Sequence, residues 1–391
     1  RPLLSSGRHW HWEKKALATC DLSAARDVPA DDLALLQYTG GTTGLSKGSM
    51  LSHKNLLTNL RQLNEHLGTN CPIKGSIVVA PLPLYHVYAF SMNFLCSLVM
   101  GYHNILIPNP RYLSRLINDI KAYKVNVFCG INPLFQKLCE HPAFSQVDFS
   151  ELHVCTSGGM PLSREIADRW YEVTGCRILE GYGLTESSPL IACNSYQDYQ
   201  LDYIGKALPE TELKIINTQG ESLESGEVGE LCVRGPQVMG AYWQQSEETS
   251  TVLDAQGWLR TGDIALLDKE GHLKIIDRLK DMIIVSGFNV YPSEIETLVS
   301  EYPGIKDVVA IGVTDSRGAE QVKLLVVVDE QAPDKESLLK FCKTKLSAYK
   351  VPKDIEFRES LPKTKLGKIL RRELKHEYNR QAQSDAPASI V

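Results

Sequence analysis

The alternation of short apolar runs with helical segments constrains the fold of this chain more than any other feature. Runs rich in aliphatic and β-branched residues predict strands at 33–38, 76–81, 103–108, 125–129 and 152–156. Segments with helical periodicity lie between them, at 52–67, 112–123 and 164–171. Strands that alternate with helices predict a mainly parallel sheet with helices on both faces. The predicted fold class is therefore α/β.

The pattern changes after Gly205. Short runs with glycine turns, at 212–217, 229–233 and 271–276, predict a β-rich subdomain of the large N-terminal domain. Beyond Arg278, a helix at 293–300 and strands at 308–313 and 323–328 predict a small α+β domain. The Ser/Ala/Asp-rich residues from about 381 onward predict a disordered tail.

Composition excludes some functional classes. The net charge of −5 and the lack of a basic run argue against a nucleic-acid partner. Ten cysteines without a C-x-x-C pair are typical of a reducing cytosol. No residue between Lys74 and Arg111 carries a formal charge, but prolines interrupt this stretch, which favours a buried core helix over a membrane span.

The strongest local signal is the glycine/threonine loop at 38–48, directly after a predicted strand. Glycines let backbone N–H groups approach an anion, and the hydroxyl groups with one lysine supply further donors. Such a loop suits a triphosphate. It is not a Walker A loop, because Ser46 rather than glycine precedes Lys47.

Three further segments carry chemistry that suits a nucleotide. Residues 179–186 (LEGYGLTE) place an aromatic ring between glycines, next to a hydroxyl and a carboxylate that can hold Mg²⁺. Residues 261–263 (TGD) and 277–281 (DRLKD) offer an aspartate and an arginine that can bind ribose hydroxyls or a phosphate. Residues 361–368 (LPKTKLGK) form a basic turn ahead of a basic helix. Taken singly, each of the three is also typical of a solvated turn.

In this order, the four segments resemble the adenylate-forming superfamily, which includes acyl-CoA synthetases, luciferases and the adenylation domains of peptide synthetases. The resemblance covers residues 31–375. The segments YTGGTTG, PLYHVYAF, EGYGLTE, VSGFNVYPSEIE and GKILRREL are most similar to bacterial long-chain fatty-acid–CoA ligases. The resemblance implies an ATP-dependent acid–thiol ligase that forms an acyl-adenylate and then an acyl-CoA, with AMP and diphosphate as the other products.

The resemblance also assigns the nucleotide site. Lys368 is expected to stabilise the transition state at the α-phosphorus, Thr185 to contact the α-phosphate, and Glu186 to hold Mg²⁺. Asp263 and Arg278 are expected to bind the ribose. The remaining residues expected to bind ATP or AMP are Thr39, Gly40, Gly41, Thr42, Thr43, Gly44, Leu45, Ser46, Lys47, Gly48, Gly158, Gly159, Glu180, Gly181, Tyr182 and Gly183.

For the acyl group and CoA, the resemblance implies a small domain that rotates between two half-reactions. The N-terminal domain would cover residues 1–277, the hinge 278–281 with Lys280 at its centre, and the mobile C-terminal domain 282–391. Tyr85, His86 and Phe90 are expected to bind the acyl substrate, His86 as a further catalytic residue and Phe90 as a gate. CoA would contact Ser286, Gly287 and Phe288.

Several alternatives stay open at this point. Family members carry a further segment before the phosphate loop, so we consider a fragment that only binds nucleotide. An acyl-AMP ligase that performs the first half-reaction ranks lower, because no insertion lies between Arg278 and Pro292. The uncharged stretch between Lys74 and Arg111 disfavours an amino-acid substrate, whose ammonium group is costly to bury. The family leads us to expect a cytoplasmic protein, a homodimer and peripheral contact with the inner membrane.

Overall fold

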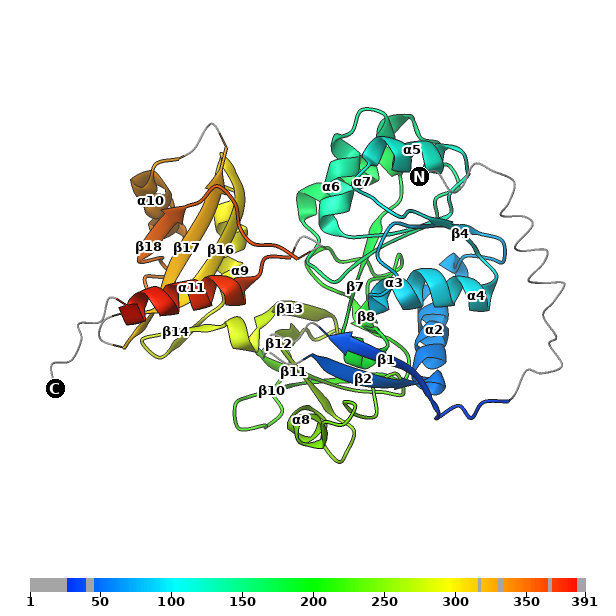
Figure 1. Ribbon diagram of the computed structural model, residues 1–391, viewed down its shortest axis with the longest axis horizontal. Helices are drawn as coiled ribbons and strands as arrows, with labels where there is room; N and C mark the ends of the chain where they lie inside the picture. Colours follow the sequence, from blue (N-terminus) through cyan, green and yellow to red (C-terminus); the bar gives the residue numbers. More distant parts are fainter. Residues whose placement is uncertain (1–26, 40–45, 316–317, 330–332, 365–367, 385–391) are drawn as a thin grey trace.

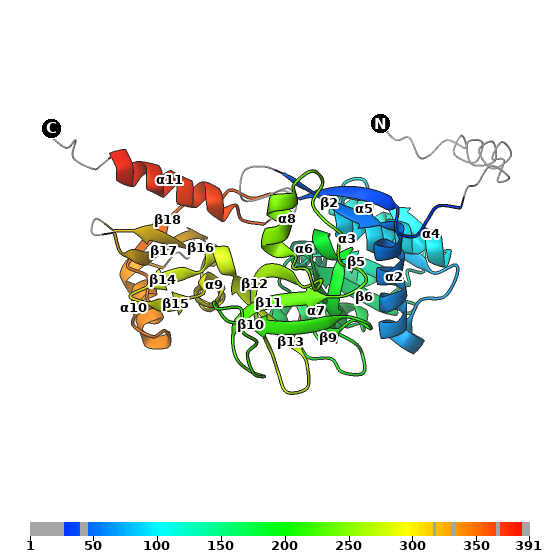
Figure 2. The same ribbon diagram turned by 90° about the horizontal axis from the view of Figure 1, so that it is seen from below.

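The computed structural model describes residues 27–39, 46–315, 318–329, 333–364 and 368–384. These residues form two lobes (Figure 1, Figure 2). The larger lobe ends with strand β13 (Leu273–Arg278), and the smaller lobe begins with strand β14 (Ile283–Val285). The short 3₁₀ turn η6 (Leu279–Asp281) connects them.

A seven-stranded sheet is the centre of the larger lobe. Its strands lie in the order β4 (His103–Leu106), β3 (Ile77–Ala80), β5 (Val127–Gly130), β6 (Val154–Gly158), β7 (Ile178–Gly183), β8 (Leu190–Cys193) and β9 (Lys206–Ala207). The first five are parallel to one another, and β8 and β9 continue the sheet in antiparallel pairing. The prediction of a mainly parallel sheet, with strands at the four places named between 76 and 156, is confirmed.

Helices cover both faces of this sheet, as predicted. They are α2 (His53–Leu67), α3 (Val87–Ala89), the π-helix η3 (Phe90–Leu95), α4 (Cys96–Met100), α5 (Leu113–Lys121), α6 (Asn132–Glu140) and α7 (Arg164–Thr174). One face packs against α5, α6 and α7. The other face packs against α2 and α3. Alternate residues of one strand, such as Val78 and Val79, therefore belong to different cores.

Local sequence explains where the helices start. Helix α2 begins after Ser52, whose Oγ accepts the backbone N–H of Asn55 at 3.1 Å, as the predicted N-cap requires. The part of the uncharged stretch between β3 and β4 contains the continuous helical segment from α3 through η3 to α4, which is buried along one side. Within the described part of the chain, no helix is long and apolar enough to cross a membrane.

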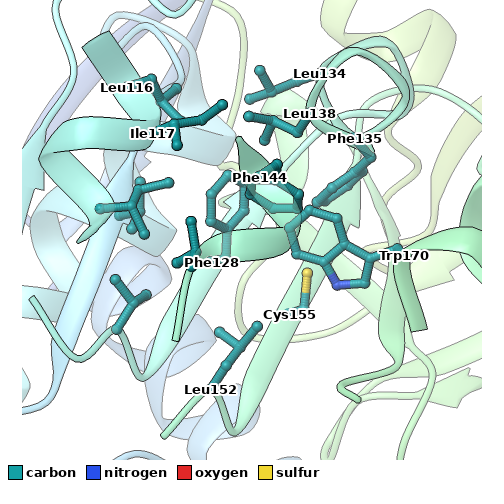
Figure 3. Packing of buried hydrophobic residues seen from close by; sticks show 14 of the residues in the cluster. Leu116, Ile117, Phe128, Leu134, Phe135, Leu138, Phe144, Leu152, Cys155 and Trp170 are labelled. Carbon is teal, nitrogen blue, oxygen red and sulfur yellow. The ribbon is translucent and has the colours of Figure 1, made fainter. Parts of the chain in front are cut away.

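Aromatic side chains fill the core on the α5–α7 face (Figure 3). Trp170 of α7 is fully buried and lies between Phe128, Phe135 and Phe144. The Phe135 and Trp170 rings meet edge to face, with centroids 4.7 Å apart. Burial of such large apolar surfaces fixes the helices on the sheet, and with them the loops that follow the strands.

Two antiparallel units complete the larger lobe. The first is the pair β1 (Leu33–Thr39) and β2 (Lys47–Ser52), and the second is the sheet β10 (Glu212–Ile216), β11 (Gly229–Arg234), β12 (Leu259–Leu267) and β13, with the short helix α8 (Ser246–Val252). The β-rich subdomain is thus confirmed. Strand β1 differs from the α/β pattern: it does not join the parallel sheet but pairs with β2, so the glycine/threonine loop connects two neighbouring antiparallel strands.

The smaller lobe is an α+β unit, as predicted. Its elements are β14, β15 (Phe288–Val290), α9 (Pro292–Ser300), β16 (Ile305–Thr314), β17 (Glu320–Val328), α10 (Lys335–Lys345), β18 (Asp354–Phe357) and α11 (Arg371–Ser384). Strands β16 and β17 are antiparallel, and β17 and β18 are parallel. Helix α11 continues past residue 381, where we expected the disordered tail to begin.

Candidate active site

A cavity of about 1070 Å³ lies at the carboxyl ends of the parallel strands. The segments that follow β3, β5, β6 and β7 form one wall, and strands β12 and β13 contribute another. The smaller lobe adds Thr364 and Lys368. Ligands of open α/β sheets generally bind at this end of the strands, so the topology alone directs attention to this cavity.

Glycines keep one wall of the cavity flat. Gly158 at the end of β6 pairs with Gly181 of β7, and both line the cavity. Gly159 has φ +80°, a conformation that side chains with a Cβ disfavour. At Gly183, a Cβ would lie 1.7 Å from the carbonyl oxygen of Pro189. A side chain would strain the backbone at Gly159 and clash at Gly183, so backbone atoms form this part of the cavity wall.

Asp263 on β12 is buried beside two partners. The hydroxyl of Tyr182 donates to Asp263 Oδ2 at 2.6 Å, and Arg278 Nε lies 3.7 Å from Asp263 Oδ1. Burial raises the pKa of Asp263, while the Tyr182 hydrogen bond and the Arg278 charge oppose this rise. The carboxylate is thus fixed at the cavity wall, with its oxygens available to hydroxyl donors.

Lys368 extends from a turn of the smaller lobe. Its backbone N–H donates to Thr364 Oγ1 at 3.1 Å, and Thr364 N–H donates to the Lys368 carbonyl at 2.8 Å. Burial of the ammonium group lowers the Lys368 pKa to about 8, and the charge of Arg278 acts in the same direction.

Positive charge is concentrated in this cavity. Lys47, Arg278, Lys280 and Lys368 all line it. Burial lowers the pKa of Lys280, and the Arg278 charge lowers it further. Burial is the main cause of both lysine pKa shifts, and the Arg278 charge adds to it. A bound anion would oppose both shifts, so the cavity suits an anionic ligand.

Glu186 offers a carboxylate on the same cavity wall, in the 3₁₀ turn η5 (Thr185–Ser187). Its Oε1 accepts the hydroxyl of Tyr242 at 2.7 Å, while Oε2 accepts no hydrogen bond from the residues that the structure describes. A hard cation such as Mg²⁺ prefers oxygen ligands and commonly combines one carboxylate with phosphate oxygens. Glu186 therefore fits a Mg²⁺ site that a bound polyphosphate completes.

His86 also lines the cavity and caps the start of α3. Its Nδ1 accepts the backbone N–H of Tyr88 at 3.3 Å. Burial lowers the pKa of His86, and the charge of Lys368 lowers it further. The imidazole is thus neutral at pH 7. Because Nδ1 is an acceptor, we assign the proton to Nε2, which can donate to a ligand carboxylate.

The structure brings thirteen of the predicted site residues together at the cavity. Those that line the cavity are Lys47, Tyr85, His86, Gly158, Gly159, Gly181, Gly183, Thr185, Glu186, Asp263, Arg278, Lys280 and Lys368. Their roles in binding and catalysis stay predictions. Gly40, Gly41, Thr42, Thr43, Gly44 and Leu45 lie outside the described residues. Thr39 pairs with Lys47 beside this gap. Ser46 and Gly48 follow the gap and are not on the cavity wall.

Other predicted residues lie away from the cavity wall. Glu180 Oε1 accepts the Leu162 N–H at 3.1 Å, and burial raises its pKa to about 7. Tyr182 is not on the cavity wall, but its hydroxyl donates to Asp263, which is. Phe90 packs against Phe94, with ring centroids 5.7 Å apart, in the hydrophobic cluster behind the cavity.

The predicted CoA-binding residues also lie outside the cavity. Ser286 and Gly287 form the turn between β14 and β15, and both have positive φ, 51° and 83°. Phe288 stacks on Tyr349, with ring centroids 4.6 Å apart. With Lys368 in the cavity, this turn contributes nothing to its walls.

Sequence reasoning missed several cavity residues, among them Tyr88, Met160, Tyr242 and Thr364. Tyr242 follows β11 in a segment without a short motif, and its partner Glu186 is 56 positions away in the sequence. Met160 directly follows the predicted residues Gly158 and Gly159, and this neighbourhood is the sequence signal that could have identified it as a cavity residue.

Comparisons with known proteins agree with this geometry. The family described as "AMP-binding enzyme" matches residues 4–243, and the "AMP-binding enzyme C-terminal domain" matches residues 294–368. A long-chain-fatty-acid–CoA ligase of Escherichia coli O157:H7 is 48% identical over 90% of this chain, which spans 63% of that relative's length.

Solved structures are similar as well. ATP-bound MatB from Rhodopseudomonas palustris superposes with a TM-score of 0.84 at 30% identity, over 93% of this chain and 72% of that one. The anthranilate CoA ligase AuaEII with anthranoyl-AMP has a TM-score of 0.82 at 26% identity, over 92% and 70%. Since the first family match covers more than half of the chain, this protein belongs to the AMP-binding enzyme family.

Proposed function

We propose that this chain is a long-chain fatty-acid–CoA ligase that uses ATP and works through an acyl-adenylate. The observation that carries the proposal is the convergence of Lys368, Arg278 and Lys280 with Asp263 on one cavity. The name of the Escherichia coli relative, at 48% identity, supports the choice of acid. Fatty acid, ATP and CoA are thus the proposed substrates.

In the first half-reaction, ATP would occupy the cavity with its base against the glycine wall and its ribose hydroxyls on Asp263. A carboxylate oxygen of the fatty acid attacks the α-phosphorus, and the bond to the diphosphate breaks. Negative charge develops on the phosphate oxygens, and the positive charge of Lys368 would stabilise it. Mg²⁺ held at Glu186 would neutralise part of the phosphate charge.

The fatty acid would lie against the part of the cavity wall that follows strand β3. Leu82, Val87 and Ala89 line the cavity with apolar side chains, next to Tyr85, His86 and Tyr88 of the same segment. Each buried methylene contributes about 0.8 kcal/mol, so an aliphatic chain binds here without specific polar partners. The Nε2 proton of neutral His86 would orient the carboxylate.

The second half-reaction requires a different arrangement of the lobes. The CoA sulfur attacks the acyl carbonyl carbon, the thiol proton is released, and AMP leaves. We propose that rotation at Lys280, in the turn η6, withdraws Lys368 and brings the Ser286–Gly287 turn to the cavity. The position of that turn outside the present cavity supports a movement between half-reactions. The homodimer and the peripheral membrane contact stay predictions.

The direct test incubates the purified chain with ATP, Mg²⁺ and palmitate, with and without CoA, and measures diphosphate, AMP and palmitoyl-CoA. Lys368→Ala should lower diphosphate release by about 100-fold or more. Lys363→Ala is the matched control, because Lys363 belongs to the same turn but its Nζ binds Asp307. Equal loss in both variants would contradict a special role of Lys368.

The remaining products separate the alternatives. Diphosphate and acyl-adenylate without a thioester would indicate an enzyme limited to the first half-reaction. Nucleotide binding without any turnover would identify this chain as a nucleotide-binding fragment, and no binding at all would refute the proposal.

A further inference from the structure

The segment after β11 connects two parts of the candidate nucleotide site. Residues 240–243 lie along the edge of β2, where Met50 N–H donates to the Ala241 carbonyl at 2.9 Å and Trp243 N–H donates to the Gly48 carbonyl at 2.8 Å. The neighbouring Met239 N–H donates to the backbone carbonyl of Glu186 at 2.8 Å. Backbone pairing thus ties this segment to the end of the glycine/threonine loop and to the turn η5.

Tyr242 points from this segment into the cavity. Its side chain is buried, with 7% of the residue exposed, and its hydroxyl lies 2.7 Å from Glu186 Oε1. Burial and the Glu186 charge raise the Tyr242 pKa, so the hydroxyl stays protonated and donates. Lys47 Nζ lies 5.2 Å from the centroid of the tyrosine ring. A single aromatic side chain therefore contacts both a proposed metal ligand and a proposed phosphate-binding lysine.

We infer that Tyr242 is a positioning residue of the nucleotide site: its hydroxyl holds one oxygen of Glu186 and leaves the other for a divalent cation. This inference rests on the proposed function, because it assigns Glu186 to Mg²⁺. A carboxylate with one oxygen tied has fewer accessible rotamers than a solvated one. Partners of this kind commonly change metal affinity or activity 10- to 100-fold when they are removed.

The test measures equilibrium binding of a fluorescent ATP analogue as Mg²⁺ is titrated, and separately with EDTA. Tyr242→Phe removes only the hydroxyl and keeps the ring below Lys47. We expect the half-saturating Mg²⁺ concentration to rise about 10-fold, with unchanged nucleotide affinity in EDTA. Tyr102→Phe is the matched control: its hydroxyl donates to the Pro72 carbonyl at the same distance of 2.7 Å, away from the cavity.

Two further variants separate the hydroxyl from the ring and from the fold. Tyr242→Leu also removes the ring and should weaken nucleotide binding in EDTA as well. Glu186→Asp keeps the charge but withdraws the carboxylate from the hydroxyl, and should show the same loss of Mg²⁺ response even if Tyr242→Phe folds poorly. The double variant with Glu186→Asp and Tyr242→Phe should lose no more of the Mg²⁺ response than either single variant.

The outcomes distinguish this inference from the proposed function. If the parent chain binds the nucleotide with Mg²⁺ dependence and Tyr242→Phe behaves like Tyr102→Phe, the Tyr242 inference is wrong and the function stands. Equal weakening with Mg²⁺ and with EDTA would show a role in the fold instead. If the parent chain binds no nucleotide, both proposals are refuted.

Discussion

Replacing Lys368 by methionine should stabilise the protein without its substrates while it removes the proposed adenylation. Methionine matches the lysine side chain out to Cε but carries no charge. Burial of the ammonium group lowers the Lys368 pKa from 10.5 to about 8, so the charged form destabilises the fold at neutral pH. A site that needs a cation for catalysis therefore reduces the stability of the empty protein.

The magnitude follows from the pKa. One unit corresponds to about 1.4 kcal/mol, so the full shift from 10.5 to about 8 would correspond to about 3 kcal/mol for an enclosed group. Lys368 is partly exposed along its side chain, and solvent screening reduces this to about 1 to 2 kcal/mol. The folded state binds fewer protons than the unfolded state between pH 8 and 10.5, so the stability of the parent rises in this window.

The assay is urea unfolding of both proteins from pH 7 to pH 10. We expect the free energy of unfolding of Lys368→Met to exceed that of the parent by about 1 to 2 kcal/mol at pH 7, and most of this difference to be gone by pH 10. Saturating ATP should narrow the difference at pH 7, because phosphate oxygens stabilise the charged lysine. A difference that does not change with pH would refute the electrostatic argument, since lost or gained packing has no such dependence.

Three other predictions use separate features. Trp170→Ala should lower the free energy of unfolding by about 3 to 5 kcal/mol in urea titrations, because the ring is fully buried among three phenylalanines. Glu296→Gln leaves the guanidinium of Arg371 at the start of α11 without its carboxylate; the same assay should show a loss of about 3 to 5 kcal/mol, and a loss below 1 kcal/mol would contradict a tight ion pair. The rate of diphosphate release at low ATP should fall as pH rises through about 8, where Lys368 loses its proton. At saturating ATP, the same fall in rate should occur at higher pH.

Local sequence predicted much of the fold, and its limits are physical. Strands such as β5 and β6 and the helix after Ser52 have signals within their own residues. The partner of β1 has no such signal, because a strand's apolar pattern shows its buried face but not its neighbour. The Tyr242–Glu186 contact depends on a pairing of distant segments and was missed for the same reason. The family resemblance predicted one nucleotide site for Asp263, Arg278 and Lys368, and all three line the cavity, whereas Phe90 packs behind it.

The pairing of β2 with the segment at Tyr242 has a consequence for the order of synthesis. Ser49 leaves the ribosome long before Tyr242, its partner in the β-bridge. At about 5 to 20 residues per second, this interval lasts roughly ten to forty seconds. During that time the outer edge of β2 has unpaired backbone groups that a neighbouring nascent chain could occupy. A cell that makes this protein should therefore benefit from a chaperone that shields the emerging hairpin until residue 243 has been added.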